Sequence, residues 1–272
     1  MESNVNKPVR HILGLSGGKD STALAIYMRD RVSEMEYVFC DTQKELPETY
    51  EYLDRIEAYL GKPITRLNDK RGFDHWLQVY GNYLPSSRMR WCTKMLKLKP
   101  FEEYVGEDRV LSYIAIRADE DRDGYISKKP NIQPVYPFKE AGITEADVRR
   151  ILETSGLGLP AYYDWRTRSG CYFCFFQRKA EWVGLLERHP DLFDKAKAYE
   201  KIDEAQGIRY TWSERESLNE LSDPERVAEI KRKHTEAMQK NTAANRGVRL
   251  YQILAETLDD EDDTQPCVIC NL

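Results

Sequence analysis

The chain has 272 residues, a formal net charge of −5 and 32% charged residues. This length allows one large α/β domain with an appendage, or two small domains, and is ample for a substantial core. The acidic balance excludes a generally basic nucleic-acid coat but not a local basic groove. No stretch approaches the length of a membrane span, and the first residues lack the regions of a signal peptide. We therefore expect a cytoplasmic protein with no membrane partner.

The first half of the chain alternates strand-like and helical patterns. Alternation of this kind predicts a parallel sheet with helices on its faces, in which ligands bind beyond the carboxyl ends of the strands. The predicted strands are His11–Leu15, Met35–Cys40, Ile64–Leu67 and Val110–Ile116, and the predicted helices are Thr22–Met28 and Pro47–Leu60.

From Ala180 onward the pattern is helical and highly charged. The acidic run 258–263 predicts a linker to a cysteine-containing tail. The predicted helices of this half are Glu181–Arg188, Leu192–Gln206 and Pro224–Lys240.

A Ser-Gly-Gly-Lys-Asp-Ser turn joins the first strand to the first helix. Its glycines let backbone N–H groups approach an anion, the N–H groups of the first helical turn point outward, and Lys19 adds a positive charge. It is not a Walker A loop, which has four residues before Gly-Lys and a Ser or Thr directly after the Lys. The alternative is an ordinary glycine turn. The turn predicts a triphosphate site formed by Ser16, Gly17, Gly18, Lys19, Asp20 and Ser21.

Asp41 and Thr42 follow the second predicted strand. Because parallel strands end at the same edge of a sheet, we expect both residues to line the crevice of the glycine turn. The alternative for Asp41 is an acid that caps a turn or a helix.

The turn 16–21 resembles the PP-loop of the ATP pyrophosphatase superfamily, whose members split ATP between the α- and β-phosphates. The stretch 39–50, with its Asp-Thr and Pro-Glu-Thr, resembles the phosphoadenosine phosphosulfate (PAPS) reductase family. Further stretches that resemble this family are 90–94 with Lys97 and Pro100, 116–120, and 170–174. The resemblance implies an α/β fold, a PP-loop (adenine nucleotide alpha hydrolase-like) doubly wound parallel sheet with a helical, cysteine-containing C-terminal extension. It divides the chain into a nucleotide-binding domain, 1–160, and a metal and substrate region with a C-terminal tail, 161–272.

The cysteines distinguish two chemistries within that family. Cluster-bearing reductases have adjacent cysteines where this chain has Trp91-Cys92, and a His after the tail Cys, where this chain has none. The single-cysteine form is more similar to the branch that acts in DNA phosphorothioation. Our leading hypothesis is an ATP-dependent adenylating sulfurtransferase that acts on nucleic acid. The alternatives are a PAPS or adenylylsulfate reductase and a nonenzymatic nucleotide-sensing adaptor that binds zinc.

Two Cys-x-x-Cys pairs predict a metal centre, because each pair suits half of a tetrahedral sulfur site for zinc or an iron–sulfur cluster. The resemblance offers Cys92 with the first pair as another ligand set. We expect an iron–sulfur cluster of the 4Fe-4S type rather than zinc, and we expect Cys40 to be a structural thiol. The candidate ligands are Cys92, Cys171, Cys174, Cys267 and Cys270.

The predicted catalytic residues are Lys19, Asp20 and Arg117. Lys19 and the backbone N–H groups would hold the β- and γ-phosphates of ATP, Mg²⁺ would lie near Asp20 or Asp41, and Arg117 would contact the α-phosphate or the attached substrate. A cysteine desulfurase or another sulfur donor is an expected partner.

Basic and aromatic residues are interleaved around the middle and late cysteines. Such a pattern predicts contacts to DNA or RNA, and its alternative is a solvated charged face. The residues are Arg88, Arg90, Lys94, Lys97, Lys99, Arg166, Arg168, Arg178 and Lys179, with Trp91, Tyr162, Tyr163 and Trp165.

Overall fold

The structure, a computed structural model, describes residues 8–121, 127, 129–213 and 215–244. The described residues form two compact units. The first unit contains the residues up to Tyr80 together with Met89–Cys171, and the second contains Gly81–Arg88 and the residues from Tyr172 onward.

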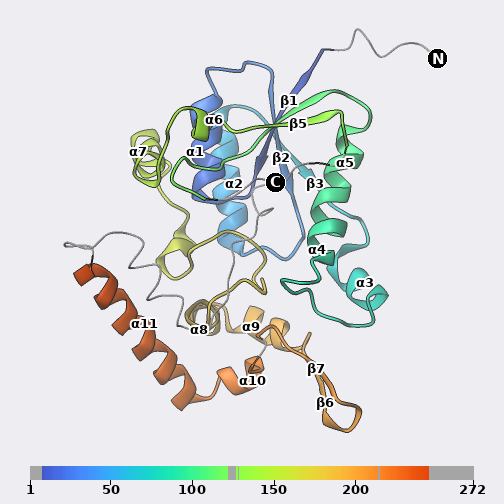
Figure 1. Ribbon diagram of the computed structural model, residues 1–272, viewed down its shortest axis with the longest axis vertical. Coiled ribbons are helices and arrows are strands. Elements are labelled where there is room, and N and C mark those ends of the chain that lie inside the picture. Colours follow the sequence, from blue (N-terminus) through green and yellow to red (C-terminus); the bar gives the residue numbers. More distant parts are fainter. Residues whose placement is uncertain (1–7, 122–126, 128, 214, 245–272) are drawn as a thin grey trace. The chain divides into compact units, whose positions relative to one another are not determined.

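A five-stranded parallel sheet forms the centre of the first unit (Figure 1). The strand order is β3-β2-β1-β4-β5, so the chain runs outward from β1 in one direction and then returns to the other side of it. The carboxyl end of β1 is therefore the point at which the strand order reverses, where open α/β sheets bind ligands. The strands are β1 (Arg10–Leu15), β2 (Met35–Cys40), β3 (Ile64–Leu67), β4 (Val110–Tyr113) and β5 (Ile132–Val135).

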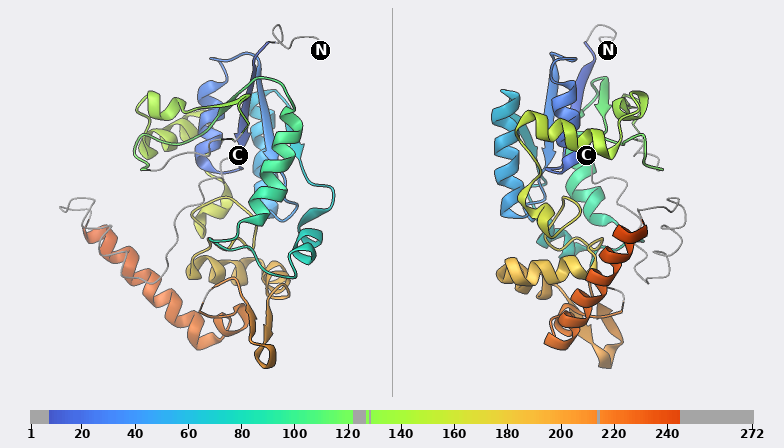
Figure 2. Two further views of the ribbon diagram at one scale, coloured as in Figure 1. Left: turned by 45° about the vertical axis from the view of Figure 1, so that its right-hand side comes forward. Right: turned by 90° about the vertical axis from the view of Figure 1, so that its left-hand side faces the viewer.

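Helices cover both faces of this sheet (Figures 1 and 2). Successive residues of a strand point to opposite faces, so β1 places Leu13 in one core and Ile12 in the other. The Leu13 core is completed by α1 (Lys19–Met28), α2 (Pro47–Leu60) and α7 (Glu145–Ser155), and the Ile12 core by α5 (Lys99–Val105). Two buried faces explain why most residues of the inner strands β1 and β2 are apolar and buried, whereas the edge strand β3 exposes Thr65 and Arg66.

The remaining elements of the first unit are short. They are α3 (Gly72–Val79), α4 (Trp91–Thr93), the π-helical turn η2 (Lys94–Leu98), α6 (Pro137–Glu140) and the 3₁₀ helix η3 (Ala161–Asp164).

The second unit is mainly helical, with Trp182, Phe193 and Trp212 buried in its core. None of the described helices is both long enough and apolar enough to cross a membrane. The elements are α8 (Lys179–Arg188), α9 (Pro190–Lys197), β6 (Lys201–Asp203), η4 (Glu204–Gln206), β7 (Ile208–Tyr210), α10 (Leu218–Leu221) and α11 (Pro224–Ala244).

The predicted α/β class with a doubly wound parallel sheet is confirmed. Two local predictions are wrong. The fourth strand ends at Tyr113 rather than Ile116, although residues 114–116 stay buried. The helix predicted over Leu192–Gln206 ends at Lys197, and an antiparallel hairpin follows it. The carboxylate of Glu200 accepts hydrogen bonds from the backbone N–H groups of Trp212 and Leu218, and these distant partners hold the chain out of a helix.

Candidate active site

The Ser16–Ser21 turn lies between β1 and α1, at the carboxyl end of the central strand. Gly17 has φ +71°, a left-handed conformation that side chains rarely adopt. A Cβ atom at Gly17 would lie 2.7 Å from Cγ2 of Thr49, a fully buried residue. The first glycine is therefore required both by its backbone conformation and by the close packing of α2.

Backbone N–H groups of this turn donate to neutral hydroxyl oxygens. The Gly18 N–H donates to Oγ of Ser16 at 3.3 Å, and the Lys19 N–H donates to the hydroxyl of Tyr163 at 3.2 Å. A charged oxygen forms roughly twice as strong a bond with an N–H group as a neutral one. A phosphate can therefore replace these hydroxyls as acceptor.

The three predicted catalytic residues lie together in one ion network. Nζ of Lys19 is 2.9 Å from one carboxylate oxygen of Asp20, and Nη1 of Arg117 is 2.9 Å from the other. Glu120 lies 2.7 Å from the same guanidinium and Glu145 lies 3.9 Å from it. Burial disfavours the Arg117 cation, but the charges and hydrogen bonds of Asp20, Asp119 and Glu120 together outweigh this effect and raise the pKa of Arg117. Two cations thus stand beside the turn, with acids that neutralise them.

Asp41 and Thr42 lie at the carboxyl end of β2, as predicted. Oδ1 of Asp41 accepts hydrogen bonds from the Gln43 N–H and the Tyr50 hydroxyl, both at 2.8 Å. Asp41 therefore stabilises the turn after β2. This agrees with the alternative prediction that Asp41 caps a turn. Its contact with a nucleotide stays a prediction.

Cys171 is placed beside the end of β2 by a buried arginine. Arg166 is 1% exposed and donates to the carbonyl oxygens of Gly170 at 3.0 Å and Cys171 at 2.8 Å. Sγ of Cys171 lies 3.1 Å from Oγ1 of Thr42 and 3.7 Å from Oε1 of Glu45. The other carboxylate oxygen of Glu45 is buried and has no hydrogen-bond partner among the residues that the structure describes. The thiol thus lies next to a buried acid with unused acceptor capacity.

The cysteines divide into one buried and three partly exposed thiols among the described residues. Burial raises the pKa of Cys40 to about 12, so this thiol stays protonated, as a structural cysteine would. Cys92, Cys171 and Cys174 are partly exposed. In the described part of the chain, no three His, Cys, Asp or Glu side chains lie close enough to hold a metal ion. Cys267 and Cys270 lie outside the described residues, and the predicted ligand set stays a prediction.

Three residues expected to contact nucleic acid are instead buried. Trp91 is 3% exposed and packs against Phe73 and Tyr80, and Tyr162 and Arg166 are each 1% exposed. The expectation is wrong for them because an interleaved basic and aromatic sequence does not distinguish a core from a surface. Lys94 and Arg178 remain exposed.

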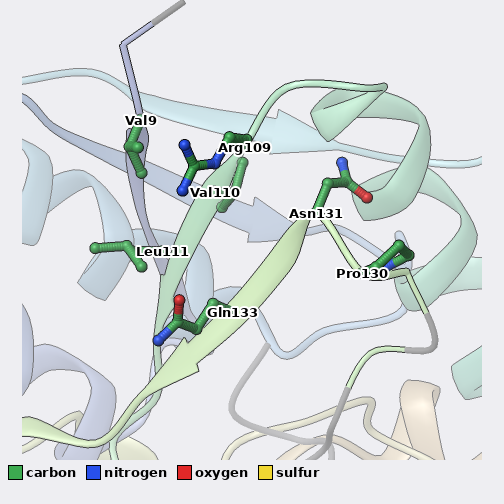
Figure 3. Close-up of a pocket in the computed structure, with 7 residues that line it drawn as sticks. All are labelled: Val9, Arg109, Val110, Leu111, Pro130, Asn131 and Gln133. Atoms are coloured by element: carbon green, nitrogen blue, oxygen red, sulfur yellow. The ribbon is translucent and has the colours of Figure 1, made fainter. Parts of the chain in front are cut away.

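The hollow in Figure 3 lies at the other end of the sheet, where β4 and β5 begin. Ligands of parallel sheets bind at the carboxyl ends of the strands, so this hollow is not part of the candidate site. Its lining residues are Val9, Arg109, Val110, Leu111, Pro130, Asn131 and Gln133.

The sequence matches one family model and is similar to curated relatives. The family model described as the phosphoadenosine phosphosulfate reductase domain matches residues 10–172. An uncharacterised protein of Methanocaldococcus jannaschii is 28% identical over 205 residues, which are 70% of this chain and 41% of that protein. The tRNA-specific 2-thiouridylase of Enterococcus faecalis is 24% identical over 187 residues, which are 56% of this chain and 50% of that protein. The chain therefore spans half or less of the length of these relatives.

A solved structure is also similar. The crystal structure of phosphoadenylyl-sulfate reductase from Candida auris, in a phosphate complex, matches with a TM-score of 0.48 and 16% identity, covering 61% of this chain and 83% of that chain.

Proposed function

Because the chain belongs to the phosphoadenosine phosphosulfate reductase family, we propose that it is an ATP-dependent adenylating sulfurtransferase that acts on nucleic acid. The observation that carries the proposal is the PP-loop at the carboxyl end of β1, with Lys19, Asp20 and Arg117 in one network. Similarity to a tRNA-specific 2-thiouridylase supports a nucleic-acid substrate.

ATP would bind with its β- and γ-phosphates on the backbone N–H groups of the PP-loop and on Lys19. Helix N-termini favour such anions, and Lys19 is only 9% exposed, so its charge is weakly screened by solvent. Asp20 offers the carboxylate oxygens that Mg²⁺ prefers, and the ion would neutralise phosphate charge there.

In the adenylation step, a substrate oxygen attacks the α-phosphorus, and pyrophosphate leaves as the bond to the β-phosphate breaks. This step needs no protein nucleophile, since positioning and charge stabilisation supply most of the catalysis. Lys19 stabilises the leaving pyrophosphate, and Arg117 stabilises the α-phosphate. A sulfur nucleophile then attacks the acceptor atom and AMP leaves. If the donor is the persulfide of a cysteine desulfurase, this attack forms an S–S bond between donor and product, and a second thiol breaks it by forming a disulfide with the donor cysteine.

The expected 4Fe-4S cluster would use ligands from Cys92, Cys171, Cys174, Cys267 and Cys270. Among the described residues, no three of these thiols lie close enough together to hold a metal ion. The described feature that favours sulfur chemistry is Cys171 beside Thr42 and Glu45, at the edge of the sheet where the PP-loop lies.

A sulfonucleotide reductase is the second candidate, because the matching family model describes a reductase domain. Anaerobically purified protein should be assayed for iron, sulfide and zinc, and for pyrophosphate release with DNA, RNA and sulfonucleotides. Pyrophosphate release that depends on ATP and nucleic acid would support the sulfurtransferase. Reduction of a sulfonucleotide without ATP would support the reductase, and a zinc-loaded protein that binds ATP without turnover would support the adaptor.

A further inference from the structure

The chain segment 161–171 lies against the PP-loop through three hydroxyl groups. Tyr162 donates to the carbonyl oxygen of Gly17 at 2.7 Å, and Ser169 donates to Oγ of Ser16 at 3.1 Å. The third hydroxyl, that of Tyr163, accepts the N–H of Lys19 at 3.2 Å. Only this third contact occupies a backbone donor at the N-terminus of α1, where an anion is favoured.

The Tyr163 hydroxyl can also donate a hydrogen bond. Among the described residues it has one polar contact, the one in which it accepts from Lys19, so its proton has no acceptor there. Burial raises the pKa of Tyr163, so the phenol keeps its proton at neutral pH. A neutral phenol, whose O–H has no acceptor among the described residues, therefore lies beside the Lys19 N–H, the donor that would bind a phosphate.

We propose that Tyr163 is a phosphate-binding residue of the PP-loop site. A β- or γ-phosphate oxygen of the nucleotide replaces the phenol oxygen as acceptor of the Lys19 N–H. The phenol O–H then donates a hydrogen bond to that phosphate. The inference rests on the proposed function, because it requires that ATP binds to the PP-loop.

The exchange is favourable because it replaces one bond between neutral groups with two bonds to a charged oxygen. Bonds to an ionised partner are roughly twice as strong as neutral ones. Loss of the hydroxyl would remove one charge-assisted bond from the complex and one weaker bond from the free protein. We therefore expect about a tenfold loss of affinity, which corresponds to about 1.4 kcal/mol.

The test compares Tyr163→Phe with the unmutated chain by calorimetry, using inorganic pyrophosphate, ATP and AMP as ligands. We expect about tenfold weaker binding of pyrophosphate and ATP and unchanged binding of AMP. Tyr104→Phe is the matched control, because the Tyr104 hydroxyl donates to Glu36, away from the PP-loop. Its affinities should equal those of the unmutated chain.

The outcomes separate this inference from the proposed function. If the unmutated chain binds neither ATP nor pyrophosphate, the proposed function fails. If it binds both and Tyr163→Phe binds them equally well, only the role of Tyr163 fails. Equal losses for ATP and AMP would also overturn that role, since a change in the fold would weaken both.

A measurement on the unmutated chain does not depend on how the variant folds. Oxidation of the Tyr163 ring by hydroxyl radicals, which does not require the phenolate and is located by peptide mass spectrometry, should slow in saturating pyrophosphate. An unchanged oxidation rate would contradict the proposal.

Discussion

Arg117, which follows β4, reaches Asp20 in the first turn of α1, with Nη1 2.9 Å from Oδ1. The two residues are 97 positions apart in the sequence, and β1 and β4 are neighbours in the sheet. The strand order reverses between these two strands, so the ion pair lies at the point where α/β sheets bind ligands. The pair holds a cation and an acid in place before any nucleotide arrives.

Replacing Arg117 by Met should lower ATP turnover by about 100-fold, because a group that stabilises transition-state charge is lost. Binding of pyrophosphate should change much less, since Lys19 and the backbone N–H groups remain. Steady-state assays of pyrophosphate release measure the first effect and calorimetry the second. Arg149→Met is the matched control, because Arg149 is half exposed on α7 and pairs with Glu145. Equal turnover in both variants would contradict the role of Arg117.

Gly17→Ala should destabilise the first unit by about 2 kcal/mol or more, because it combines a left-handed backbone with a clash against Thr49. Gly142 has a similar φ of +66°, but no atom of the described part of the chain lies within 4 Å of its Cβ position. Gly142→Ala should therefore show the backbone strain alone and cost about 1 kcal/mol. Urea unfolding of both variants measures the difference, and equal losses would show that Thr49 moves aside without cost.

The sheet was predictable because its inner strands are buried on both faces. The inner strand 35–40 and the helix 47–60 were predicted with the bounds that the structure has. The edge strand 64–67 was also predicted with its bounds, although only its two end residues are buried. β5 was missed because it is a four-residue strand with Pro134, a residue tolerated there since β5 is at the edge of the sheet. The hairpin of β6 and β7 was missed because Glu200 accepts hydrogen bonds from backbone groups 12 and 18 positions later in the chain, beyond the reach of helical periodicity.

The PP-loop was predictable because its residues are contiguous. Tyr162 and Arg166 were misjudged as nucleic-acid contacts, because they are buried against main-chain atoms. Tyr162 donates to a carbonyl oxygen 145 positions away, and Arg166 donates to two carbonyl oxygens within its own segment. Periodicity and composition carry no signal for such contacts.

The stability of the second unit should depend on pH through Glu216. Its carboxylate accepts hydrogen bonds from Arg226 and pairs with Lys179, and these contacts lower its pKa to about 2. A lowered pKa in the folded state stabilises the protein above the unfolded pKa of about 4.3, and this contribution is lost as the pH falls toward 2.

The comparison is between the unmutated chain and Glu216→Gln. With solvent screening taken into account, the variant should be less stable by about 1–2 kcal/mol at pH 7, and the difference should shrink between pH 5 and pH 2. Thermal unfolding across this range measures it, with the exposed Glu51→Gln as control. A difference that does not change with pH would contradict the assignment.

Cys171→Ser should abolish any brown visible absorbance of anaerobically purified protein, because thiolate ligands govern the assembly of a cluster. Cys40→Ala should leave that absorbance intact, since Cys40 is buried and protonated. Absorbance spectra with iron and sulfide analysis measure both. An iron-free, zinc-loaded protein would contradict the iron–sulfur assignment, and equal bleaching in both variants would contradict the distinction between the two cysteines.

The most direct test of the central claim is calorimetric titration of ATP into the unmutated chain and into Lys19→Ala, with Lys70→Ala as a control at an exposed position. Lys19 lies 2.9 Å from Asp20 at the PP-loop, so its removal should weaken ATP binding by about tenfold or more while the fold is kept. Lys70→Ala should bind ATP as the unmutated chain does. A folded Lys19→Ala protein with unchanged ATP affinity and unchanged pyrophosphate release would contradict the account.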